Sequence, residues 1–64
     1  MTGQEVRAAR RRLGLTQAAF AKRVGVERVT LARWEVGLNP VNRTAAILIR
    51  LLTQQAPTRQ NRRK

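Results

Sequence analysis

The chain has 64 residues, of which 14 are lysine or arginine and 3 are glutamate, so its formal net charge of +11 indicates a polyanionic partner. A chain of this length forms one small domain with a marginal core. It contains no histidine, cysteine, serine, aspartate or tyrosine, which excludes the usual zinc sites, disulfide bonds and serine or cysteine nucleophiles, so we expect no enzyme activity, metal or cofactor.

The first predicted helix covers residues 2–12 and has a clear start and end. Thr2 and Glu5 form a T-x-x-E capping box, in which the hydroxyl and the carboxylate each satisfy a free backbone amide. The apolar positions that follow recur at helical spacing, and Gly14 marks the end of the helix.

Two shorter helices are predicted next, over residues 17–24 and about 28–36. Thr16 is a suitable N-cap for the first of them, and Gly25 ends that helix. Gly37 ends the second helix. Helices this short need packing partners to be stable.

A fourth helix is predicted over about residues 43–54, with Asn42 as its N-cap. It is apolar nearly all round, so we expect one face in the core and another against a partner. Residues 56–64 are rich in cations and polar side chains, and we expect them to form a disordered basic tail. The folded domain is therefore expected over residues 1–55.

The segment from residue 13 to residue 37, LGLTQAAFAKRVGVERVTLARWEVG, places the second and third helices on either side of a glycine turn. This is the layout of a helix-turn-helix, in which Ala21 must be small where the helices cross and Gly25 supplies a positive φ. The segment strongly resembles the Cro/C1-type (XRE) helix-turn-helix family of phage repressors, bacterial regulators and antitoxins. With its flanking helices, the resemblance covers about residues 3–53. It implies an all-α, lambda-repressor-like bundle of four or five short helices, whereas a generic bundle with solvated cations does not explain the joint spacing.

The resemblance implies that the third helix is the recognition helix and lies in the major groove. The residues expected to contact bases are Arg28, Val29, Thr30, Ala32 and Arg33. Each arginine suits a bidentate contact with guanine or, alternatively, a phosphate contact. Val29 and Ala32 suit thymine methyl groups but are also tolerated as small exposed apolar residues, and Thr30 suits a base or a phosphate.

Phosphate or minor-groove contacts are expected around this helix. The residues concerned are Thr16, Gln17, Arg11, Arg23, Asn39 and Arg43. Gln17 matches a family glutamine that binds phosphate and braces the recognition helix, at a helix end that favours anions. Thr16 is alternatively only a cap, and Arg11 and Arg43 are alternatively only solvated.

The resemblance also implies a partly buried ion pair between Arg10 and Glu35, which ties the first helix to the third, and a core position for Trp34. Two features depart from the family pattern. Glu27 stands where relatives usually have a serine or threonine cap, and the loop over residues 36–41 carries no cation.

Ile47 and Leu51 lie four residues apart on the fourth helix, and we expect them to form an isologous homodimer contact. The alternative is that both belong to the monomer core. A dimer reads a palindromic operator with half-sites about one turn (~34 Å) apart. The predicted function is a homodimeric repressor that binds double-stranded DNA and responds to its own concentration, with no small-molecule ligand. Small phage autorepressors, including those encoded beside anti-CRISPR genes, share this build.

Two alternatives belong to other functional classes. One is an antitoxin-type interaction module whose main partner is a toxin protein. The other is a cationic peptide of membrane surfaces, but the predicted helices lack the broad apolar face with aromatic residues that this requires. The longest apolar stretch, residues 45–49, is also too short to span a membrane, so we expect a cytoplasmic protein without a membrane partner.

Overall fold

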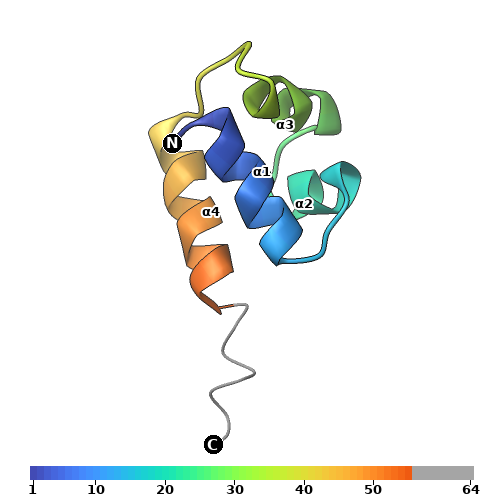
Figure 1. The fold of residues 1–64 in the computed structure, drawn as a ribbon, viewed down its shortest axis with the longest axis vertical. Coiled ribbons are helices and arrows are strands. Elements are labelled where there is room, and N and C mark those ends of the chain that lie inside the picture. Colours follow the sequence, from blue (N-terminus) through green and yellow to red (C-terminus); the bar gives the residue numbers. More distant parts are fainter. Residues whose placement is uncertain (56–64) are drawn as a thin grey trace, which may run out of the picture.

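A computed structural model describes residues 1–55 of the chain (Figure 1). These residues form four α-helices, α1 (Gly3–Arg12), α2 (Gln17–Val24), α3 (Arg28–Glu35) and α4 (Arg43–Gln55). No strand occurs within this range, and the predicted all-α fold is confirmed. The predicted basic tail, residues 56–64, lies outside the described residues.

The helix ends lie within one residue of the predicted ones, and the caps explain where each helix begins. Thr2 is the N-cap of α1: its backbone amide donates to Glu5 Oε1 (2.8 Å), and the Glu5 amide donates to its hydroxyl (3.2 Å). Thr16 and Asn42 each accept a hydrogen bond from the backbone amide three residues further on, at 3.1 and 2.8 Å. Glu27 is the N-cap of α3 but makes no capping hydrogen bond with its side chain, so α3 begins without the bond that a serine or threonine would supply.

The turn between α2 and α3 depends on a glycine. Gly25 has a φ of 88°, in the left-handed region that side chains with a Cβ rarely adopt. The amides of Gly25 and Val26 both donate to the carbonyl oxygen of Ala21, at 2.8 and 3.0 Å. Ala21 is itself buried, so α3 leaves this turn packed closely against α2.

The core lies where the four helices meet, and α1 runs between α4 and the α2–α3 pair (Figure 1). Its buried apolar residues are Val6, Ala9, Phe20, Ala21, Val24, Leu31, Trp34, Ala45 and Ile49. Trp34 is only 4% exposed, so it packs in the core and is not an exposed stacking surface for bases. No helix among residues 1–55 is long and apolar enough to cross a membrane.

The start of α1 packs directly against the end of α3. A Cβ atom added to Gly3 would overlap the carbonyl oxygen of Trp34 and would lie 2.7 Å from that of Glu35. Both obstacles are backbone atoms, which cannot rotate away. Gly3 therefore sets how closely the two helices approach.

We predict that Gly3→Ala destabilises the protein, although alanine is the better helix former. The added methyl group forces α1 away from α3, and overpacking of this kind costs about 1–3 kcal/mol. For a domain of this size, each kcal/mol lowers the melting temperature by roughly 4–8 °C. Thermal unfolding followed by circular dichroism measures the change. Gln4→Ala, at the exposed neighbouring position, is the control and should melt like the parent protein.

Candidate nucleic-acid interface

The α3 helix has a buried face and an exposed face. The side chains on the buried face are those of Leu31, Trp34 and Glu35. The exposed side chains are those of Arg28, Val29 and Arg33. Thr30 and Ala32 are half-buried. The two arginines and Val29, all expected to contact bases, are therefore accessible to a large ligand such as a DNA duplex.

A buried carboxylate holds this helix in place. The Glu35 side chain has no exposed surface, yet it lies among three donors from other helices. Arg10 donates from Nε to Oε2 at 2.7 Å and from its Nη2 to Oε1 at 3.2 Å. Gln17 Nε2 donates to Oε1 at 3.1 Å, and Arg7 Nε lies 3.5 Å from the same oxygen. Residues of α1 and α2 thus converge on the last residue of α3.

The charges of this cluster stabilise one another. Burial by itself raises the pKa of the Glu35 carboxyl, but the hydrogen bonds from Arg10 and Gln17 and the charge of Arg10 outweigh it. The pKa of Glu35 therefore lies below its ordinary value, and the carboxylate is ionised at neutral pH. The hydrogen bond to Glu35 in turn raises the pKa of Arg10. Arg10 also donates from Nη1 to the Leu15 carbonyl oxygen at 3.1 Å, which joins the α1–α2 connection to the cluster.

Gln17 connects the buried cluster to the exposed face of α3. Its side-chain amide donates to Glu35, and its carbonyl oxygen accepts a hydrogen bond from Arg28 Nη1 at 3.4 Å. The sequence predicted neither this bond to Arg28 nor the contact of Arg7 with Glu35. The position of Arg7, three residues before Arg10 on the same helix, was the available signal, because that spacing puts both side chains on one helix face.

The residues expected to contact phosphate lie around the Glu35 cluster. Thr16 and Gln17 stand at the N-terminus of α2, where the first backbone amides lack partners inside the helix. The remaining exposed residues of this set are Arg11, Arg23, Asn39 and Arg43. None of their charged groups forms an ion pair with another residue in the range 1–55. They come from α1, α2, the α3–α4 connection and the start of α4.

One known protein family matches the chain over almost all of these four helices. A family model described as helix-turn-helix matches residues 6–53. The chain belongs to the Cro/C1-type helix-turn-helix family. Its members are DNA-binding regulators, so the protein is a DNA-binding regulator built around α2 and α3. Comparison with curated proteins and with solved structures finds no match.

The helix-turn-helix carries no grouping of side chains suited to a metal ion. Within residues 1–55, no three histidine, cysteine, aspartate or glutamate side chains come close enough to form a site. The polar groups that the structure brings together are instead the arginine, glutamine and glutamate side chains described above. Their arrangement positions α3 and presents cations to solvent.

We predict that Glu35→Ala destabilises the protein by about 3–5 kcal/mol, because Arg10 then loses its partner in a partly buried place. Chemical denaturation at neutral pH measures the loss. Glu27→Ala is the matched control: it removes a carboxylate from the same helix, but one that is exposed and makes no capping bond. An unchanged stability of Glu35→Ala would show that the cluster contributes little.

The same variant should also change the pH dependence of stability. Because the folded-state pKa of Glu35 is lowered, its contribution is complete above the unfolded-state value of about 4.3 and is lost as the pH falls through the lower folded-state pKa. The parent protein should therefore lose stability more steeply than Glu35→Ala between about pH 5 and about pH 3. The capping carboxylate of Glu5 is present in both proteins and does not contribute to the difference. Equal slopes would contradict the assignment.

Proposed function

We propose that the protein is a sequence-specific repressor that binds a palindromic operator in double-stranded DNA as a homodimer, in the bacterial cytoplasm. The observation that carries this proposal is the exposed, cationic face of α3, held by the buried Glu35 cluster in a chain of the helix-turn-helix family. A rigidly held helix suits base recognition because little conformational freedom is lost on binding.

Base recognition is assigned to the exposed residues of α3. Arg28 and Arg33 carry guanidinium groups that donate in a planar fork to O6 and N7 of guanine. Val29 is 42% exposed and offers an apolar surface for a thymine methyl group. Thr30 and Ala32, which are half-buried, contact only bases that lie close to the helix axis.

Phosphate recognition is assigned to the start of α2 and to the cations around it. The side-chain amide of Gln17 has two N–H donors, and one of them donates to Glu35. The second N–H, together with the first backbone amides of α2, suits a phosphate at the positive end of the helix. Arg11, Arg23, Asn39 and Arg43 add contacts on either side, with Thr16 retaining its capping role.

Dimer formation is assigned to the exposed face of α4. Ile47 and Leu51 are 52% and 48% exposed and are separated by one helical turn. Ile49 on the same helix is fully buried, so the two exposed residues are not needed to complete the monomer core. A two-fold contact between these faces pairs two recognition helices for half-sites about one turn (~34 Å) apart. Occupancy of such a site excludes polymerase, and repression follows from protein concentration.

We predict that Arg28→Ala and Arg33→Ala each weaken operator binding by about 1–3 kcal/mol and relax the preference at one base position. Selection from a random duplex pool at near-physiological salt identifies the operator, and repeated selection with each variant shows which position is relaxed. Arg23→Ala is the comparison, because loss of a phosphate contact weakens all sequences alike and lowers the salt slope by about 1. A pool without an enriched palindrome would overturn the proposed operator.

We predict that Leu51→Glu converts the dimer into a monomer at micromolar concentration, because it places a charge in an apolar contact. Sedimentation velocity measures the association, and binding to the full palindrome should weaken while binding to a single half-site stays unchanged. Val36→Glu is the matched control, since Val36 is 65% exposed and lies outside α4. A Leu51→Glu protein that remains dimeric would exclude this face as the interface.

A further inference from the structure

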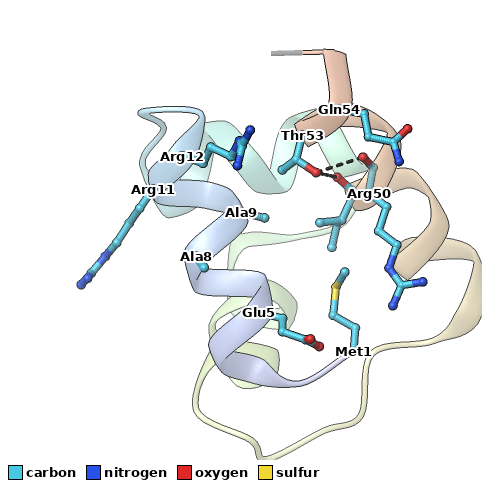
Figure 2. A pocket seen from close by; sticks show the side chains of 10 residues that line it. Met1, Glu5, Ala8, Ala9, Arg11, Arg12, Arg50, Thr53 and Gln54 are labelled. Atoms are coloured by element: carbon cyan, nitrogen blue, oxygen red, sulfur yellow. Dashed lines mark hydrogen bonds between the residues drawn. The ribbon is translucent and has the colours of Figure 1, made fainter. Parts of the chain in front are cut away.

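A groove runs between α1 and α4, on a side of the molecule that the helix-turn-helix does not use (Figure 2). Its accessible apolar surface comes from the exposed Ala8 and from the half-buried Met1, whose side chain lies between the two helices. Ala9 and Ile49 also line the groove but are almost completely buried. Arg12 and Arg50 stand on its opposite edges. Every residue that lines the groove belongs to α1, α4 or position 1, and none belongs to α2 or α3.

The groove and the α3 contact occupy different faces of α1. The side of α1 that faces α3 contains Gly3, Arg7 and Arg10. The backbone of α3 packs against Gly3, and Glu35 binds both arginines. Glu5, Ala8 and Arg12 line the groove, and so does Arg11, which is also assigned to phosphate above. The mean directions of these two sets of three residues lie roughly 190° apart around the helix, and Arg11 lies between them. A molecule in the groove would therefore leave α3 open and would share only Arg11 with the proposed DNA contact.

The charges along the groove are predominantly positive and are not neutralised within residues 1–55. Neither Arg12 nor Arg50 forms an ion pair with another residue in that range. The single acid, Glu5, already accepts the backbone amide of Thr2 in the capping box. An occupant that buries apolar side chains between the helices would need carboxylates at its edges to match these guanidinium groups.

We propose that this groove binds an acidic amphipathic helix of another protein, with its apolar face on Met1 and Ala8 and its carboxylates beside Arg12 and Arg50. Helices commonly bind in this way, through apolar side chains spaced three and four residues apart that enter an apolar groove between flanking polar groups. Complementary charge then sets the orientation and the choice of partner.

Other occupants match the groove less well. A DNA backbone offers phosphates but no apolar side chains for the surface formed by Met1 and Ala8. A second copy of the chain has only 3 acids, of which Glu35 is buried and Glu5 lines the groove itself. The segment 56–64 of the same chain contains four cations and no acid, so Arg12 and Arg50 repel it.

The test uses the full chain and a designed peptide probe. The probe is a fluorescein-labelled helix of roughly four turns, about 15 residues long, with leucine along one face and glutamate elsewhere. One control peptide replaces glutamate by lysine, and a second replaces leucine by serine. Fluorescence anisotropy gives the affinity, and amide chemical shifts of the isotopically labelled protein locate the site. We expect the acidic leucine peptide to bind most tightly and to shift the signals of Ala8, Ala9, Ile49 and Thr53.

Variants of the protein distinguish peptide binding in the groove from general attraction by the net charge. Arg50→Glu should lower the affinity for the acidic peptide about fivefold or more, since an attraction between charges becomes a repulsion. Ala8→Gln, which fills the groove without a charge change, should weaken it as well. Lys22→Glu makes the same charge change on an exposed residue of α2 and should alter the affinity less than about twofold.

Several results would overturn the proposal. Peptide-induced shifts on α3 would show that the acidic probe merely imitates DNA phosphate. An equal effect of Lys22→Glu and Arg50→Glu would show attraction to net charge alone. Shifts of the groove signals that depend on protein concentration without any peptide would identify a second copy as the occupant. Absence of binding by the acidic leucine peptide would refute the groove as a helix-binding site.

Discussion

The burial of the Glu35 carboxylate is the constraint on which the arrangement of the helices depends. An ionised carboxylate without exposed surface is costly unless several donors replace its water. Here Arg10 and Arg7 come from α1 and Gln17 comes from α2, so the three helices must hold one relative position to satisfy a single side chain at the end of α3. In a chain this small, whose core contains few large apolar residues, such a directional contact specifies geometry that apolar packing alone leaves loose.

The distribution of charge shapes the rest of the molecule. A net charge of +11 opposes compaction and opposes contact between two copies. Glu35 offsets this repulsion locally by holding two arginines beside it, while the other cations among residues 1–55 are exposed to solvent. The α4 helix, by contrast, carries only Arg43 and Arg50 over its 13 residues. The proposed dimer contact on α4 therefore brings few cations together, and the exposed Ile47 and Leu51 suit that contact.

Most of the fold could be predicted from the sequence because its signals are local. Each helix end depends on residues that are close in the sequence, as in the capping box at Thr2, the cap at Thr16 and the glycine at position 25. The observed helices accordingly lie within one residue of the expected bounds. The contacts of the site are less predictable, since they join residues far apart in the sequence. The resemblance to a family implied the pairing of Arg10 with Glu35, but the bond from Arg28 to Gln17 depends on rotamers that no local pattern determines. The groove between α1 and α4 was equally invisible, because it requires the angle between two helices.

The contact of Arg28 with Gln17 links stability to recognition. Gln17 spans the interval between the buried Glu35 and the exposed Arg28, so the carboxylate that positions α3 also positions, through one amide, a guanidinium group on its outer face. The bond to Arg28 is long, at 3.4 Å, and exposed, so the guanine acceptor proposed for Arg28 would displace it at little cost. Gln17 still keeps its bond to Glu35 when that exchange occurs, because a different atom makes it. In the proposed complex the helix therefore stays fixed while the arginine changes partner, and the free energy of base contact is not spent on ordering the protein.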